Sequence, residues 1–184
     1  MILPIYIYGH PILRTLCKDI DVDYDNLDVL IDDMFSTMRN AHGVGLSAPQ
    51  IGRSINLFII DLSAYAEENP SLANIKGVFI NPVIIKELGE FDTHNEGCLS
   101  IPGLRADVER KNTIEVTYYD QKWKRHSVQM DGILARVFQH EYDHLNKVLF
   151  IDYLPPLKKN IVNRKLKYIQ KGKFDNDYPT ILKQ

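Results

Sequence analysis

The sequence has little of several features that define other protein classes. It contains only two cysteines, too few for a disulfide framework, and no run of the roughly 20 apolar residues that a transmembrane helix needs. The net charge is −2, so there is no electrostatic case for nucleic acid as the main ligand. The start, Met1 to Pro4, lacks the positive charge and the long apolar core of a signal peptide. We therefore expect a protein of the reducing cytoplasm with no membrane association and no sequence-specific nucleic-acid binding.

The composition suits a single domain over residues 1–184. With 184 residues, 45% of them apolar, the chain is long enough to bury a sizeable core. An amphipathic helix is predicted to open at Asp25 or Asn26 and to stop before Gly43.

Later segments predict a mixed fold. Runs rich in branched and aromatic residues predict strands at 55–62, 78–85 and 113–119. The segment 63–76 is typical of a surface excursion between strands. Because the strands come mainly before a helix predicted at 132–146, and a second helix follows it, we expect an α+β fold. Antiparallel sheets would pack around the first of these helices, with a C-terminal helix beyond.

The most informative motif lies in the helix predicted at 132–146, which Asp131 is expected to cap. His140 and His144 are four residues apart, so both imidazoles can reach one metal ion. Glu141 is rotated by about 100° from His140, which leaves it beside the ion and free to act on a bound water. These side chains continue an apolar stripe, and polar groups buried there without partners would each cost several kcal/mol. The pattern predicts a metal-dependent hydrolase.

A third metal ligand must come from outside this motif. Phe150 stands where a longer H-E-x-x-H-x-x-G-x-x-H motif would have its third histidine, and no glutamate follows Glu141. The ligand is therefore an upstream residue or one of the later aspartates, Asp152, Asp175 and Asp177. Cys98 is the strongest candidate, because a thiolate is a good ligand and the loop predicted at 95–100 contains Gly97, which allows close backbone approach.

Three segments of the chain form a recognisable series. They are Gly-Val-Gly-Leu-Ser-Ala-Pro-Gln at 43–50, Glu-Gly-Cys-Leu-Ser at 96–100 and Gln-His-Glu-Tyr-Asp-His-Leu at 139–145. In order and spacing they resemble the three motifs of the peptide deformylases, and Gly-His-Pro-Ile-Leu-Arg at 9–14 is similar to the family's N-terminal segment. The resemblance spans nearly the whole chain. It implies removal of the N-formyl group from nascent polypeptides that begin with formyl-methionine.

The resemblance also implies a role for each matching residue. The implied metal ligands are Cys98, His140 and His144. Glu141 is implied as the catalytic acid and base, and the side chain of Gln50 with the backbone N–H of Leu99 as the binding site of the oxyanion. Ferrous iron is the implied metal in the cell, whereas a Cys-His-His set by itself tolerates zinc, iron, nickel or cobalt.

A substrate of this kind needs an apolar pocket for its methionine side chain and a track for its backbone. Val44, Gly45 and Val137 are predicted in the wall or rim of that pocket. Gly43, Gly45 and Gly97 would let an extended peptide pair with the enzyme backbone as an added strand. The alternative is that these glycines only shape turns.

Two arginines are candidates for charged roles. Arg105 is predicted to contact the peptide substrate. Either Arg105 or Arg110 could instead neutralise Glu96 or Asp143, and the sequence does not choose between these roles.

Two positions depart from the commonest family pattern. Ser47 stands in place of an alanine, and its hydroxyl adds only a modest need for a hydrogen-bond partner. At the position of Lys147, family members often have a glycine. A glycine there would suit a left-handed helix end. We expect Asn146 to take that conformation instead.

Other function classes remain open at this point. A metalloprotease or aminopeptidase would share the H-E-x-x-H mechanics. A structural module could close a four-ligand site by adding Cys17 to the three ligands named above. Cys17 stands between Leu16 and Lys18 with no ligand-like neighbours, so we predict a small buried apolar side chain instead.

The basic run at 158–173 predicts the C-terminal helix. Its apolar side chains are expected to pack inward: Ile161, Val162, Leu166 and Ile169. The lysines and arginines would then form a solvated face. A transient contact with ribosomal RNA near the exit of nascent chains is the alternative role for this face.

Overall fold

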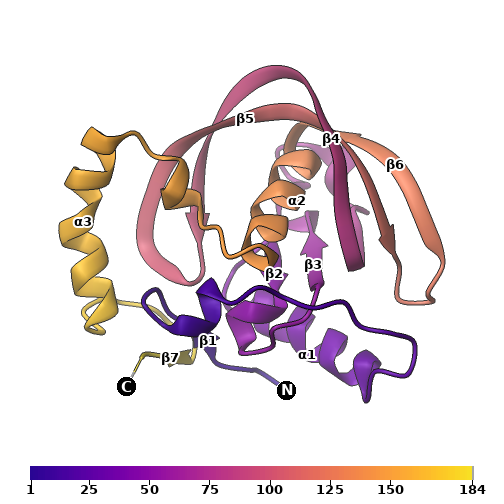
Figure 1. Cartoon of the computed structure of the whole chain (residues 1–184), viewed down its shortest axis with the longest axis horizontal. Helices are drawn as coiled ribbons and strands as arrows, with labels where there is room; N and C mark the ends of the chain where they lie inside the picture. Colours follow the sequence, from indigo (N-terminus) through magenta and orange to yellow (C-terminus); the bar gives the residue numbers. More distant parts are fainter. Residues whose placement is uncertain (184) are drawn as a thin grey trace.

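The computed structural model describes residues 1–183, in which an antiparallel sheet curves around a central helix, α2 (Gly132–Leu145) (Figure 1). In order across this five-stranded sheet, the strands are β2 (Gly45–Ser47), β3 (Leu57–Asp61), β4 (Lys76–Cys98), β5 (Ile101–Tyr119) and β6 (Arg125–Asp131). The α+β class, with antiparallel strands around this helix and a C-terminal helix after it, is confirmed.

β4 and β5 form a long hairpin that arches over α2 (Figure 1). Its strand register shifts at several places, including Ile80/Val83, Ile84/Lys86 and Leu88/Phe91. Irregularities of this kind bend a strand and increase its twist. The hairpin can therefore follow the curved surface of the helix and carry its far end, with Cys98, back to the helix.

The strands predicted at 55–62, 78–85 and 113–119 are confirmed, but the hairpin extends far beyond them. The loop predicted at 95–100 is wrong except for its last two residues, because β4 continues to Cys98. Asn95, Glu96 and Gly97 pair with Asp107, Ala106 and Arg105 of β5. Pairing with a strand that returns after the turn overrides the local preference of asparagine and glycine for loops.

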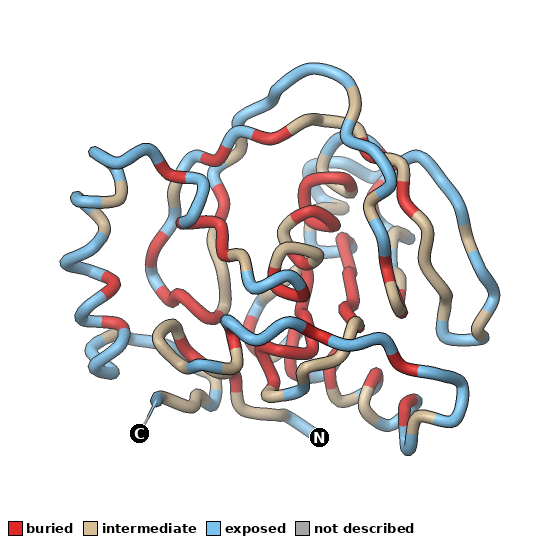
Figure 2. The backbone as a smooth tube through the Cα atoms, in the orientation of Figure 1, coloured by how far each residue is buried: buried red, intermediate tan, exposed pale blue. Residues whose placement is uncertain are grey.

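α2 lies at the centre of the molecule and is mostly buried (Figure 2). Its Phe138 contacts Phe58 of β3 edge to face at 4.9 Å and Phe79 of β4 at 5.2 Å, geometries that favour aromatic pairs. The bounds predicted for this helix are confirmed within a residue. Asp131 occupies the N-cap position, but its side chain makes no capping hydrogen bond within residues 1–183, so that detail of the prediction is wrong.

α1 (Leu27–Asn40) packs against β2 and β3. The side chains that it buries repeat at helical spacing and include Leu27, Ile31, Met34, Phe35 and Met38. Its predicted start next to Asn26 and its end before Gly43 are confirmed.

The end of α2 differs from the expectation. Asn146 has a φ of −102° and remains on the right-handed side, whereas Lys147 takes the left-handed conformation with a φ of 66°. The side chain of Asn146 donates a hydrogen bond to the Tyr142 carbonyl one turn earlier, which holds Asn146 close to the helix. The left-handed turn therefore falls on the next residue, a lysine, which pays a steric cost that a glycine would avoid.

Replacing Lys147 with glycine should raise the free energy of unfolding by about 0.5–1 kcal/mol, because the relief of strain exceeds the extra freedom of the unfolded chain. The exposed lysine side chain is removed without emptying the core. Asn146→Gly is the matched control and should lower stability, since that position gains nothing from a left-handed residue. Urea denaturation of both variants measures the difference. A Lys147→Gly protein no more stable than the parent would contradict the strain argument.

α3 (Pro156–Gln170) is the predicted C-terminal helix, and it packs beside β5 at one end of the molecule (Figure 1). Leu166 and Ile169 are buried as predicted, and Val162 packs against the same cluster. Ile161 is 77% exposed, so its predicted inward position is wrong. Only a narrow strip of this peripheral helix meets the core.

No helix within residues 1–183 combines the length and the apolar character needed to cross a membrane.

The two ends of the chain are joined by a small sheet that the sequence did not predict. β1 (Ile5–Tyr6) pairs in parallel with β7 (Thr180–Ile181), so this pair is an exception to the expected antiparallel sheets. The pair brings the segment after α3 back underneath the larger sheet (Figure 1).

Candidate metal centre

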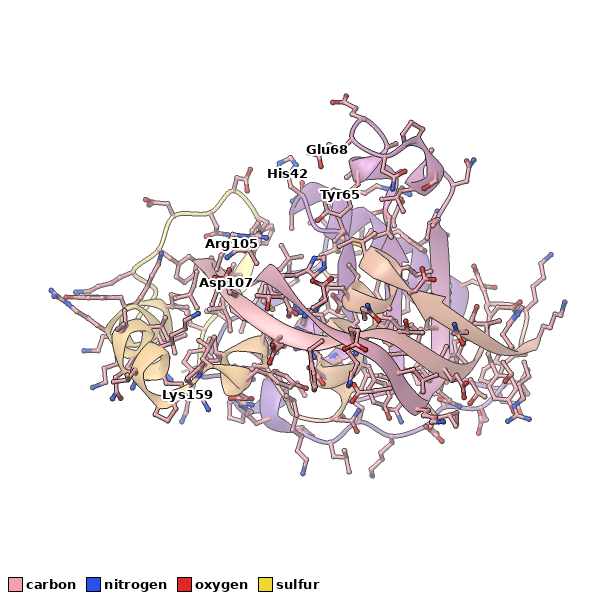
Figure 3. All side chains as sticks on the ribbon, turned by 90° about the horizontal axis from the view of Figure 1, so that it is seen from above. His42, Tyr65, Glu68, Arg105, Asp107 and Lys159 are labelled. Carbon is pink, nitrogen blue, oxygen red and sulfur yellow. The ribbon has the colours of Figure 1, made fainter. Side chains whose placement is uncertain are left out.

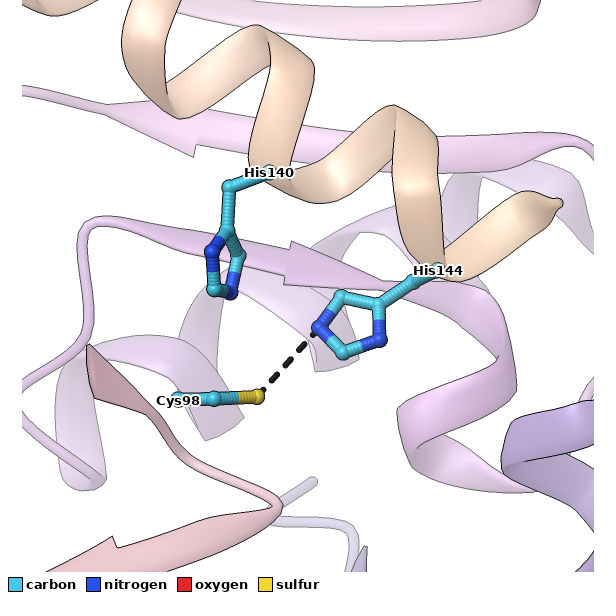
Figure 4. Close-up of side chains that lie close together, drawn as sticks. All are labelled: Cys98, His140 and His144. Atoms are coloured by element: carbon cyan, nitrogen blue, oxygen red, sulfur yellow. Dashed lines mark hydrogen bonds between the residues drawn. The ribbon is translucent and has the colours of Figure 1, made fainter. Parts of the chain in front are cut away.

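The side chains of Cys98, His140 and His144 converge where the end of β4 meets α2 (Figure 4). The Cys98 Sγ lies 3.3 Å from Nε2 of His144, and one donor atom from each of the three residues lies within 4.8 Å of the others. Around a tetrahedral ion, with bonds of about 2.3 Å to sulfur and about 2.0 Å to nitrogen, such donors stand about 3.5 Å apart. The group therefore fits one divalent metal ion held by three protein ligands.

Cys17 takes no part in this group. It is buried in an apolar cluster with Phe58 and Leu145, and burial raises the pKa of its thiol to about 11. The prediction of a buried, apolar Cys17 is confirmed. The closed four-ligand site is contradicted, because the group of metal-type side chains within residues 1–183 does not include Cys17.

The three aspartates considered as ligands also lie outside this group. Asp152 is engaged by Arg14 through two hydrogen bonds of 2.5 and 3.0 Å. Asp175 and Asp177 are exposed and line the outer part of the pocket described below.

His140 is oriented by a buried carboxylate. Its Nδ1 lies 2.9 Å from Oε2 of Glu96, which leaves Nε2 as the nitrogen available for a metal ion. Although burial works in the opposite direction, hydrogen bonds from His140 and Arg110 hold the pKa of Glu96 well below its ordinary value. Carboxylate partners of this kind fix the orientation of ligating histidines.

Arg110 decides the question that the sequence left open. Its guanidinium donates to both oxygens of Glu96, at 2.8 and 3.1 Å, and to Asp143 at 2.6 Å. Arg105 instead donates to the side chain and the backbone carbonyl of Asn95. Arg110, and not Arg105, therefore pairs with both Glu96 and Asp143, whereas Arg105 remains at the pocket.

Sequence reasoning missed Arg136. This arginine is buried, donates to Glu96 at 3.0 Å and also donates to two backbone carbonyls of the hairpin, those of Val108 and Asp92. It lies one turn before His140 on the same helix. The sequence did contain a signal for this role. Arg136 is a positively charged residue four positions before a predicted metal ligand, on a helix predicted to be largely buried.

Glu141 is 4% exposed and faces β2. The hydroxyl of Ser47 lies within hydrogen-bonding distance of its Oε2 and, at 3.0 Å, of its backbone carbonyl, so its single proton serves these two acceptors. A Cβ at Gly45 would lie only 2.4 Å from Oε1 of Glu141, so this glycine is needed for close approach and does more than shape a turn. Burial is the main cause that raises the pKa of Glu141 above its ordinary value.

Gln50 points its amide toward the same centre. It belongs to a 3-10 helix, η2 (Ala48–Ile51), and its Oε1 accepts a hydrogen bond of 2.8 Å from the Ser47 backbone N–H. Its Nε2 lies 3.5 Å from the Cys98 Sγ and 3.3 Å from the Ser100 hydroxyl. The carbonyl end of the amide is thus fixed, and the donor end faces the Cys98 thiol.

A cavity of about 450 Å³ opens over this centre. All the residues predicted for substrate binding lie in its lining: Val44, Gly45, Gly97, Arg105 and Val137. The lining also includes Gln50, Leu99, Cys98, His140 and Glu141. Figure 3 places His42 and Tyr65 on one flank of this region and Arg105 on the other.

The cavity also has a wall that the sequence did not suggest. Residues Asp175 to Tyr178, which follow α3, line it together with His42, which lies two residues after the end of α1. Nothing in the composition of this short polar segment distinguishes it from a solvent-exposed tail.

Residues 2–160 match the family model described as Polypeptide deformylase. The chain belongs to the peptide deformylase family. It is 47% identical over 185 residues to the peptide deformylase of Christiangramia forsetii, covering 97% of this chain and 94% of the relative. It is 46% identical over 178 residues to that of Cytophaga hutchinsonii, covering 97% and 96%.

Solved structures of peptide deformylases share the fold. The chain superposes on a peptide deformylase from Legionella pneumophila with a TM-score of 0.81 and 36% identity, covering 94% of this chain and 98% of that one. A mutant of the Arabidopsis thaliana peptide deformylase 1B gives a TM-score of 0.84 at 35% identity, covering 92% and 90%. Family membership makes this chain a hydrolase, and it carries a Cys-His-His group suited to a metal ion.

Proposed function

We propose that this chain hydrolyses the N-formyl group from nascent polypeptides that begin with formyl-methionine and releases formate. The observation that carries the proposal is the convergence of the Cys98, His140 and His144 side chains beside a cavity that Glu141 and Gln50 also line. A structural metal site would need neither a buried carboxylate nor a cavity beside its ligands.

The proposed ligands are Cys98, His140 and His144, and ferrous iron is the proposed ion in the cell, a choice that rests on the family resemblance. Zinc, nickel or cobalt also suit one sulfur and two nitrogen donors. A divalent ion with three protein ligands supplies a fourth position for water and lowers the pKa of that water toward neutrality.

Glu141 moves the protons in the proposed reaction. Its buried carboxylate takes a proton from the attacking water, and a bond forms between the water oxygen and the formyl carbon. When the carbon–nitrogen bond breaks, Glu141 returns the proton to the departing amine. The Ser47 hydroxyl and the absence of a side chain at Gly45 keep this carboxylate against β2, in reach of the centre.

The negative charge that develops on the formyl oxygen needs donors. The Nε2 group of Gln50 and the backbone N–H of Leu99 are proposed for this role, because both residues line the cavity beside the ligands. A donor of this kind can be worth about 3 kcal/mol in the transition state.

The substrate is proposed to lie along the cavity as an added strand. β2 is the edge of its sheet, and Gly45 and Gly97 reduce the bulk near a peptide backbone. Val44 and Val137 offer apolar surface for the methionine side chain, and Arg105 is proposed to contact the peptide further along.

Formylated nascent chains emerge from ribosomes, so we place the protein in the cytoplasm. Contact of the basic face of α3 with ribosomal RNA stays a prediction. The exposed position of that helix is compatible with a solvated face and with such a contact alike.

The deciding experiment measures formate release from formyl-Met-Ala-Ser by the metal-loaded protein. A tight wall around the formyl group should exclude the extra methyl of an acetyl group, and a misplacement of about 1 Å can cost roughly a hundredfold in rate. The expected result is rapid formate release, with acetyl-Met-Ala-Ser cleaved at least about a hundredfold more slowly. Cleavage of unformylated Met-Ala-Ser would indicate an aminopeptidase instead, and equal kcat/KM for the acetyl and formyl peptides would refute the proposed pocket.

The ligand assignment predicts opposite results for the two cysteines. Cys98→Ser should lose most of its bound metal, because a serine hydroxyl is a poor substitute for a thiolate. Cys17→Ser should retain about one ion per chain, since this side chain is packed in the apolar cluster. Metal content of the purified proteins by elemental analysis tests both. Loss of the ion in Cys17→Ser with retention in Cys98→Ser would reverse the assignment.

A further inference from the structure

The segment that follows α3 returns to the catalytic cavity. Residues Asp175 to Tyr178 line this cavity, although they lie beyond residues 2–160, which match the family model. In Figure 3 this pale yellow segment leaves α3 and passes beside Arg105, another lining residue. The last part of the chain therefore has a place in the site that its sequence motifs do not describe.

Within this segment, Tyr178 contacts the residue proposed to bind the oxyanion. Its hydroxyl donates a hydrogen bond of 2.8 Å to the backbone carbonyl of Leu99. The next carbonyl in the chain, that of Ser100, accepts a hydrogen bond of 2.8 Å from the backbone N–H of Tyr8. Two successive carbonyls of the turn between β4 and β5 are thus held from outside the hairpin, one by each end of the chain.

The pairing of β1 with β7 holds these two donors in place. The Ile5 N–H donates to the Pro179 carbonyl, and the Ile7 N–H donates to the Ile181 carbonyl, each at 2.9 Å. Tyr178 immediately precedes the first of these bonds, and its ring packs against the same apolar cluster as Leu99. The phenol is therefore anchored through its backbone and through its ring, so its hydroxyl has little freedom to leave the Leu99 carbonyl.

We propose that Tyr178 is a positioning residue that holds the Leu99 backbone for oxyanion binding. The inference rests on the proposed function, in which the Leu99 N–H is a donor in the transition state. The N–H and the carbonyl of Leu99 flank a single Cα, so a bond that fixes the carbonyl also restrains the direction of the N–H. The pairing of β1 with β7 holds Tyr178 in position to make this hydrogen bond to the Leu99 carbonyl.

Tyr178→Phe tests this role by removing only the hydroxyl. With formyl-Met-Ala-Ser and the metal-loaded protein, kcat should fall about tenfold, less than the roughly hundredfold cost of deleting an oxyanion donor outright. KM should stay within about twofold, because the lost restraint acts on the transition state rather than on peptide binding. Tyr168→Phe is the matched control on the outer part of α3 and should keep the kcat of the parent.

Hydrogen exchange of the Leu99 amide provides a second readout that needs no turnover. In metal-loaded protein labelled with 15N-leucine, this exchange should be faster in Tyr178→Phe than in the parent and unchanged in Tyr168→Phe. A merely structural role would lower the melting temperature and leave kcat per metal-loaded chain and the Leu99 exchange unchanged, which would overturn the inference. An active parent with an equally active Tyr178→Phe overturns the inference alone, whereas a parent that releases no formate overturns the proposed function and the inference with it.

Discussion

Replacing Glu141 with glutamine is expected to lower kcat for formyl-Met-Ala-Ser by at least about two orders of magnitude, the usual scale for general acid and base work. The amide has nearly the same shape and still accepts a hydrogen bond from Ser47, but it cannot take a proton from water. Because Glu141 is not one of the three proposed ligands, the variant should keep about one metal ion per chain. Steady-state kinetics and metal analysis of the same preparation measure both quantities.

Glu109→Gln is the matched control for this variant. It makes the same chemical change at an exposed position of β5, so kcat should equal that of the parent. Near-normal turnover of Glu141→Gln at full metal content would rule out the acid and base role. Loss of metal in that variant would instead point to Glu141 as a ligand.

Replacing Arg110 with methionine is expected to lower the free energy of unfolding by about 3–5 kcal/mol, the cost of leaving a buried charge without its partner. The guanidinium is 4% exposed and bridges the carboxylates of Glu96 and Asp143. Arg136 would still face Glu96, but Asp143 would keep only the hydroxyl of Tyr153 among the side-chain partners within residues 1–183. Urea denaturation of the parent and the variant gives the difference.

Arg105→Met is the informative control, because the sequence could not distinguish Arg105 from Arg110. Arg105 is exposed and bonds to Asn95, so its loss should change the unfolding free energy by no more than about 0.5 kcal/mol. If both variants lost the same free energy of unfolding, the buried pairing of Arg110 with Glu96 and Asp143 would contribute no more to stability than the exposed contact of Arg105.

Local pattern was sufficient for the helix that carries the site. The spacing of His140 and His144, with the apolar stripe before them, predicted α2 to within a residue at its end. Helical periodicity depends only on neighbours three and four residues away, so it can be read from the chain itself. The same argument succeeded for α1, and it failed for Ile161 because a peripheral helix buries a narrower strip than its apolar residues suggest.

Contacts between distant segments were beyond this kind of reasoning. Residues 95–98 belong to a strand because they pair with β5, which follows the turn. The register of this pairing is set by the whole hairpin. Ser47 was expected to need little from its surroundings, yet its hydroxyl meets Glu141, which lies 94 residues further along the chain. Such a contact leaves no trace in either local sequence.

By itself, then, the sequence determined which residue types could perform metal-dependent hydrolysis, and its resemblance to one family named their roles. Only the tertiary structure decided which charged groups pair, where the left-handed residue after α2 falls, and that the last residues of the chain reach the turn at Leu99. The physical reason is that periodicity and motif spacing are local properties. Burial, charge pairing and strand pairing depend on which distant segments meet.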